Sequence, residues 1–117
     1  MQYLGRSDLD ARDTLAAIED GVRRHRAVEV EQLFLVLQWC DLHSSDPRDE
    51  PGPRPPGSDR LGRLGGDGTP GVRELALCEL AVARQIHALS ARSLVGDLLD
   101  LRHRLPRVLE RVVSLDA

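Results

Sequence analysis

Apolar residues in the first third of the chain repeat at helical spacing. When successive residues are turned by about 100°, seven of them fall on one stripe: Leu15, Ile18, Val22, Val30, Leu33, Leu37 and Cys40. Ser7 or Asp8 is suited to cap this helix, which is expected to begin near Asp10. From Leu33 to Leu42 apolar residues occur on every side, so this segment is predicted to form the centre of the core.

The stripe is interrupted in its middle. Arg26 and Glu29 lie on the apolar line, and Gly21 lowers helix propensity in the same region. The pattern therefore allows either one long helix or two helices joined near residues 21–27.

Residues 44–71 have a different composition. They hold six of the seven prolines and most of the glycines. Too few apolar residues are present to offset the conformational entropy that ordering would cost. A disordered, mobile linker is predicted, with local polyproline character near residues 53–56.

Helical patterning resumes after this linker. One helix is expected from near Glu74 to about His87, and another from near Ser90, a suitable N-cap, to beyond Arg104. Pro106 predicts a kink or a new helix start. A heptad-like seam runs through the region, formed by Leu94, Leu98, Leu101, Leu105, Val108, Val112 and Leu115.

The seam has two interpretations. The simpler one is a stripe that packs in the core of a helical bundle. The other is a surface for homo-oligomerisation, formed by Leu94, Leu98, Leu101 and Leu105.

Composition and charge limit the classes of protein to which this chain can belong. A chain of 117 residues fits one small domain, and a net charge of −3 with a pI near 5.8 argues against strong non-specific binding of nucleic acid. The longest apolar run, Leu33–Leu37, is too short to span a bilayer, and residues 1–8 lack the apolar core of a secretory signal. Cys40 and Cys78 are therefore expected as reduced thiols in the cytoplasm.

The helix pair after residue 74 resembles a helix-turn-helix motif. The residues that suit its interlocking positions are Leu80, Ala81, Ile86, Ala91 and Leu94. Three residues depart from the usual pattern: Gln85 stands where glycine is common, Arg84 where an apolar residue is common, and His87 where a capping serine is common.

Arg92, Arg102 and Arg104 are the candidate DNA contacts on the second helix of this pair. Asp97 and Asp100 lie on the same helix, and phosphates would repel their carboxylates. Both groove binding and plain helix packing remain open, and packing is the more common outcome for two short helices. The cluster Arg23-Arg24-His25-Arg26 lies near acidic residues and is interpreted as a solvated helix face.

Three segments carry a resemblance to a known family. They are Trp39-Cys-Asp-Leu-His43, Leu64-Gly-Gly-Asp-Gly-Thr-Pro70 and Leu99-Asp-Leu-Arg-His-Arg-Leu-Pro106. Through them the chain resembles the actinobacterial domain of unknown function that precedes HNH endonuclease domains, the thirteen-E-twelve repeat family. The resemblance covers most of the chain outside the proline-rich segment. It implies an α-helical domain that members typically join to a C-terminal, metal-binding HNH nuclease domain.

The nuclease half is not expected in this chain. An HNH site needs a general-base histidine, usually an asparagine, and metal-ligating histidine or aspartate in a ββα fold. The sequence has no asparagine, no readable strand hairpin and no Cys-x-x-Cys pair. The resemblance therefore implies a truncated member, a fragment of a longer gene or a free-standing helical domain.

Other catalytic arrangements are also not predicted. Cys40 and Cys78 lie in apolar helical surroundings, and the glycine-rich residues 64–69 lack the lysine and preceding strand of a P-loop. The four histidines do not form a recognised ligand set. We expect no catalytic, cofactor, metal or small-molecule site.

These observations predict an all-α fold, a small helical bundle with a helix-turn-helix-like C-terminal half and a long disordered central loop. The expected organisation is a single domain with a helical segment 1–43, a linker 44–71 and a helical segment 72–117. The expected function is that of a non-catalytic accessory module that contacts DNA or protein. The alternatives are a structural module that self-associates through the seam and a truncated gene remnant.

Overall fold

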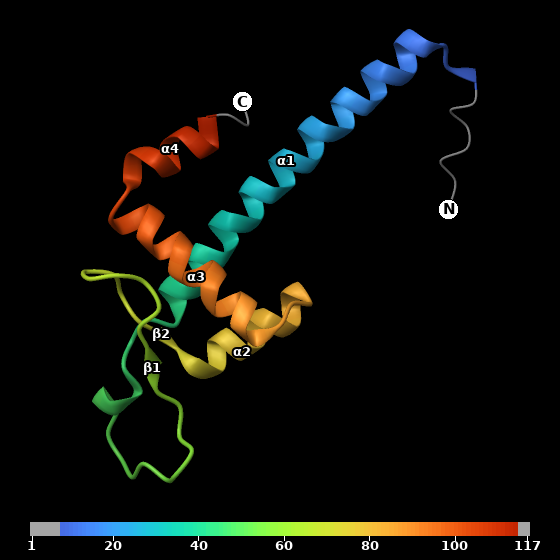
Figure 1. Ribbon diagram of the computed structural model, residues 1–117. Coiled ribbons are helices and arrows are strands. Elements are labelled where there is room, and N and C mark those ends of the chain that lie inside the picture. Colours follow the sequence, from blue (N-terminus) through green and yellow to red (C-terminus); the bar gives the residue numbers. More distant parts are fainter. Residues whose placement is uncertain (1–7, 115–117) are drawn as a thin grey trace.

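The structure, a computed structural model, describes residues 8–114 of the chain. Within this range most residues are helical, and Figure 1 shows one long helix that extends far beyond the others. The helices are α1 (Ala11–Leu42), α2 (Glu74–Arg84), α3 (Ala88–His103) and α4 (Pro106–Ser114). The remaining elements are a 3₁₀ turn, Pro47–Asp49, and two short strands, β1 (Leu61–Gly62) and β2 (Val72–Arg73). The predicted helical class is confirmed, but the strand pair was not predicted.

The long N-terminal helix α1 is continuous. It has 32 residues, so it is about 48 Å long. Its cap is Asp10, whose Oδ1 accepts a hydrogen bond from the backbone N–H of Asp13 at 2.7 Å. Of the two caps proposed from the sequence, Asp8 is therefore not the cap, and Ser7 lies outside the described residues. Gly21 and Arg26 lie within the helix, so the two-helix alternative is wrong.

The core forms where the C-terminal third of α1 meets α2, α3 and β2. Its buried residues are Val36, Leu37, Cys40, Val72, Ala76, Leu77, Leu80, Val95, Leu98 and Leu99. Trp39 packs at its edge and donates its indole N–H to the carbonyl of Ala76 at 2.9 Å. The core is thus built from two stretches of the chain, residues 36–40 and 72–99, that the segment 44–71 separates in sequence.

The prediction that residues 33–42 form the centre of the core is confirmed on one side of α1 only. Val36, Leu37 and Cys40 are buried, whereas Phe34 and Leu35 are about half exposed. α2 and α3 cover one side of the helix, and no described element covers the other. An apolar residue on every side therefore did not mean burial on every side.

Residues 44–71 follow a defined path rather than that of a wholly disordered linker. β1 and β2 pair antiparallel, with Leu61 opposite Arg73 and Gly62 opposite Val72. The part before β1 projects away from α1 as an exposed loop, and the part after it returns against α3 (Figure 1). The segment is irregular, as its composition predicts, but it is anchored.

Carboxylates anchor the ends of this loop. Asp59 accepts a hydrogen bond from the N–H of Leu75 at 3.0 Å, which caps the start of α2 from outside the helix. Asp100 on α3 accepts one from the N–H of Gly66 at 2.7 Å. These contacts join residues far apart in sequence, so a local composition argument could not anticipate them.

The loop passes close to α3 at Gly96. A Cβ at this position would lie 2.6 Å from the carbonyl oxygen of Leu64. No real Cβ approaches a backbone oxygen so closely without a shift of the chain. Glycine is therefore required at this position for the loop to pack on α3.

Pro106 begins a new helix, as its position predicts, because its missing N–H and fixed φ suit the first helical turn. The seam divides at this break. Leu98 is buried, and Leu94 and Leu101 pack against the core. Leu105 and Val108 are exposed, and Leu115 lies outside the described residues.

Membrane spans were not expected from the sequence. None of the helices within residues 8–114 has the length and apolar character needed to cross a bilayer.

Candidate functional site

The joint between α2 and α3 has the backbone geometry of a tight helix-turn-helix connection. Gln85 takes the left-handed conformation, with φ 58° and ψ 44°, at the position where the motif usually has glycine. The N–H of Ile86 then bonds to the carbonyl of Ala81 at 3.0 Å and closes α2. The turn therefore has the expected place and form, although its residue is not the usual one.

His87 caps α3. Its Nδ1 accepts a hydrogen bond from the N–H of Leu89 at 3.0 Å, and α3 begins at Ala88. The N-cap predicted at Ser90 is therefore wrong, because His87, three residues before that serine, is the N-cap of α3. His87 was counted as a departure from the motif, yet it does the work of the capping serine.

The residues chosen for the interlocking positions lie where two packed helices require them. Leu80 and Ala81 are buried on α2, and Ala91 is fully buried on α3. Ile86 and Leu94 are partly buried. The two helices pack through these side chains, as both interpretations of the motif require.

The three candidate DNA contacts, two on α3 and Arg104 at its C-cap, are all paired with carboxylates. Arg92 Nη1 lies 3.1 Å from Glu74 Oε2, and Arg104 Nη1 lies 3.4 Å from Asp100 Oδ1. Arg102 makes a two-pronged contact with Asp41 on α1, at 2.6 and 3.0 Å. Each guanidinium already has an anionic partner within the chain.

These arginines also face different parts of the structure. Arg92 faces the start of α2, whereas Arg102 faces the end of α1. The exposed side of α3 between them carries Ser90, Ser93 and Asp97. The structure therefore does not gather the three candidates into one free basic patch.

The other basic cluster lies on α1. Arg23 and Arg24 both contact Asp20, at 3.6 and 3.1 Å, and His25 contacts Glu29 at 2.9 Å. All of these side chains are more than half exposed, so each pair contributes little to stability. A solvated helix face, as interpreted from the sequence, fits this arrangement.

The N-terminal half of α1 carries an uncovered apolar stripe. Leu15, Ile18 and Val22 are 58%, 58% and 56% exposed, although the sequence placed them on the same stripe as the buried Leu37 and Cys40. Figure 1 shows this half of α1 standing clear of the other described elements. Sequence periodicity identified the stripe, but it could not show that the core covers only one end of it.

A hollow of about 270 Å³ continues the stripe toward the core. Its walls come from α1 and from α4, and its lining residues are Arg26, Glu29, Val30, Leu33 and Val112. α4 is amphipathic, and it presents Val112 to α1 while Val108 remains 45% exposed. An apolar surface thus runs from the free half of α1 to the face of α4.

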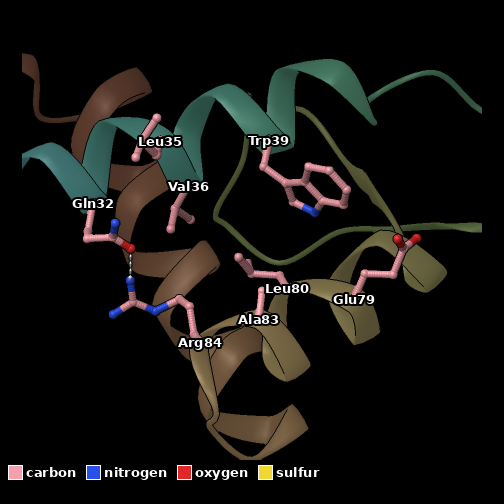
Figure 2. Close-up of a pocket in the computed structure, with 8 residues that line it drawn as sticks. All are labelled: Gln32, Leu35, Val36, Trp39, Glu79, Leu80, Ala83 and Arg84. Carbon is pink, nitrogen blue, oxygen red and sulfur yellow. Dashed lines mark hydrogen bonds between the residues drawn. The ribbon is translucent and has the colours of Figure 1, made fainter.

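A second hollow, of about 310 Å³, lies between α1 and α2 (Figure 2). Val36 and Leu80 are its most buried lining residues, and Leu35 and Trp39 line it from α1. Arg84 lies at one end and donates a hydrogen bond from Nη1 to Gln32 Oε1 at 3.3 Å. The Nε of the same guanidinium is buried and has no hydrogen-bond partner among the described residues. Because that atom is covered by the protein itself, it does not offer a contact to a ligand in the hollow.

The described residues contain no group of three or more histidine, cysteine, aspartate or glutamate side chains placed to hold a metal ion. Cys40 is buried, and this burial raises the pKa of its thiol to about 11, while the charge of Arg102 acts in the opposite direction. A thiol with so high a pKa is a poor nucleophile at neutral pH. The short pair β1–β2 runs directly into α2, but its residues are leucine, glycine, valine and arginine, none of which is a usual metal ligand.

Comparisons of the chain with protein-family models, with curated proteins and with solved structures find no match.

Proposed function

We propose that this chain is a non-catalytic interaction module that works by contact with another protein, an accessory role of the kind that its resemblance implies. The observation that carries the proposal is the free half of α1. Its apolar side chains Leu15, Ile18 and Val22 are more than half exposed along one face of the helix. Large apolar patches on a folded surface are characteristic of contact sites.

Helix energetics support the same proposal. Isolated helices of about 12–15 residues are marginal in water, and most helical stability in proteins comes from packing of an apolar face. Among the residues that the structure describes, the segment 11–29 of α1 has a packed neighbour only near its C-terminal end, at the hollow beside α4. A partner that covers Leu15, Ile18 and Val22 would supply the missing packing.

DNA contact is the second candidate, favoured by the turn geometry at Gln85. It is the weaker one, because Arg92, Arg102 and Arg104 already face carboxylates within the chain. Binding to phosphate would first have to break these pairs.

Self-association through the seam is less favoured, because only Leu105 and Val108 of the seam are exposed among the described residues. In each case the chain is proposed to act in the cytoplasm, where its two cysteines stay reduced.

Photo-cross-linking tests the proposal. A benzophenone amino acid replaces Ile18 on the free stripe, and in a matched control it replaces Ala17, which is also exposed but lies outside the stripe, about 100° around the helix from Ile18. In cells of the source organism, the first position is expected to give protein adducts and the second to give none. Equal labelling at both positions, or no adduct at Ile18, would refute protein contact through α1.

Fluorescence anisotropy of a labelled duplex across a salt series tests the DNA candidate. We expect no binding that weakens steeply with salt. If such binding occurs, and if replacing Arg92, Arg102 and Arg104 by glutamine abolishes it while the helical circular dichroism is kept, DNA contact replaces protein contact as the function.

A further inference from the structure

The proposed function requires a protein that covers the free half of α1, and the inference about that partner rests on it. We propose that the partner is a second copy of this chain, and that the two α1 helices pair antiparallel about Gly21. The inference uses the distribution of charge along α1, the hollow beside α4 and the length of the uncovered stripe. Each of these supports the same occupant.

Oppositely charged residues flank the apolar stripe on one side of α1. At about 100° per residue, Glu19 and Arg23 lie beside the stripe, whereas Asp13, Asp20 and Arg24 lie on the far side of the helix. An antiparallel pair about Gly21 sets residue 19 of one copy opposite residue 23 of the other. Glu19 and Arg23 then face each other twice, once on each side of the centre. A parallel pair would place like charges side by side, which is unfavourable.

The salt bridges that these residues make within one helix do not compete strongly. Asp20 contacts both Arg23 and Arg24, but every partner is more than half exposed. Exposed pairs of this kind contribute little, and a carboxylate can accept from more than one guanidinium. Glu19 and Arg23 can therefore engage a second copy without loss of a strong internal contact.

The hollow between α1 and α4 lies where the second copy would reach. In the antiparallel arrangement, the second copy's Leu15 lies opposite residue 27, beside the hollow lined by Arg26, Val30 and Val112. A leucine side chain fits an apolar depression of this kind between two helices. The exposed face of α4, with Val108 beside Val112, would flank the incoming helix. The result is a bundle of four helices, α1 and α4 from each copy.

The length of the stripe fits a modest interface. Residues 11–29 span roughly 28 Å of helix, and with α4 the paired surfaces fall near the low end of stable interfaces, roughly 1,200 Å² in total. A dimer that dissociates at low concentration is therefore expected, rather than a permanent one. Its two-fold symmetry follows directly from the antiparallel pairing.

Sedimentation equilibrium over a concentration series tests the inference on the purified chain. We expect the mass to rise from monomer to dimer with concentration. Ile18→Glu places a carboxylate at the centre of the apolar contact and should weaken the dimer at least about tenfold. Ala17→Glu adds the same charge outside the stripe and should leave the dimer unchanged. Ile18 is exposed in the monomer, so both variants should keep the helical circular dichroism of the parent chain.

Charge reversal tests the pairing of Glu19 with Arg23. The single variants Glu19→Arg and Arg23→Glu should each be monomeric, because positions 19 and 23 then carry the same sign in both copies. An equimolar mixture of the two should dimerise.

Orientation is tested with a nitroxide at Arg12→Cys in a Cys78→Ser background, where Cys40 is buried. Antiparallel pairing about Gly21 predicts a distance of roughly 30 Å between the two labels, whereas parallel pairing predicts roughly 10–15 Å.

The outcomes separate this inference from the proposed function. A chain that stays monomeric at all concentrations overturns the second copy as partner, and so does a dimer that Ile18→Glu leaves intact. In either case an adduct of Ile18 with a different protein would leave the proposed function standing. No adduct at Ile18 together with a monomeric chain overturns both.

Discussion

Replacing glycine by alanine should have opposite effects at two helical positions of this protein. In an open helix alanine is favoured over glycine by about 1 kcal/mol, because glycine loses more backbone entropy on folding. Gly21 in α1 has this freedom: the nearest atom to an added Cβ is Arg24 Nη2 at 3.9 Å, at the end of a flexible side chain. Gly21→Ala should therefore stabilise α1 by about 0.5–1 kcal/mol.

Gly96→Ala should destabilise the protein, although Gly96 also lies in a helix. The added Cβ would lie 2.6 Å from the carbonyl oxygen of Leu64 and 3.2 Å from its carbonyl carbon. These are backbone atoms of a loop held by the bond from the N–H of Gly66 to Asp100, so they cannot rotate away. Overpacking of this kind costs about 1–3 kcal/mol. After the gain in helix propensity, a net loss of about 1 kcal/mol or more is expected.

Thermal and urea unfolding measure the two effects. Trp39, the only tryptophan, reports on the core, and circular dichroism at 222 nm reports on total helix. A loss of 1 kcal/mol in a domain of this size lowers Tm by about 4–8 °C, so Gly96→Ala should melt at least that much earlier by Trp39 fluorescence. The gain from Gly21→Ala should be largest in the helical signal, because that part of α1 lies away from the core. Equal stabilisation by both substitutions would refute the close contact between the loop and α3.

Three further substitutions test single contacts. Gln85→Gly should raise the free energy of unfolding by about 1 kcal/mol, because glycine adopts a φ of 58° without steric cost; unchanged stability would contradict the left-handed turn. Asp59→Ala should lower it by about 1 kcal/mol in urea unfolding, since the N–H of Leu75 loses its acceptor, and a neutral result would mean that water replaces the cap. Burial raises the pKa of Cys40 from 9.0 to about 11, so the folded protein keeps a proton that the unfolded chain releases in this range. Stability should therefore be full below pH 9 and fall by about 2 kcal/mol as pH rises to 11, a loss that should be absent in Cys40→Ala. At neutral pH a thiol reagent should label the exposed Cys78 and should reach Cys40 only after unfolding.

Local pattern predicted the helices well. The apolar period located α1 and the proline at 106 marked the start of α4, whereas the helix expected to run to about His87 ends at Arg84, before the turn at Gln85. Each of these signals acts through the backbone within a few residues, which is the range that sequence reasoning can follow. The cap at His87 was missed because histidine is not among the common capping residues.

Tertiary contacts could not be predicted in the same way. Arg102 and Asp41 are 61 residues apart, and no local spacing indicates that they meet. The loop 44–71 was expected to be disordered because its composition is poor in apolar residues, yet its order comes from Asp59, Asp100 and the two-residue strand pair. Hydrophobic periodicity likewise identifies a face without showing what covers it, so it could not show that Leu15, Ile18 and Val22 stay exposed while Leu37 and Cys40 are buried.

Whether a residue joins two elements of the fold or lies exposed on one of them decides which variants can reveal the function. Arg102 joins α3 to α1 through Asp41, and Arg92 joins α3 to the start of α2 through Glu74. A loss of binding after their replacement could therefore come from a loosened fold as easily as from a lost contact. Ile18 is more than half exposed and makes no hydrogen bond or ion pair that its replacement could break. A change in the behaviour of the chain after its substitution therefore reports on what covers α1, and the free half of this helix is where the search for a partner is most direct.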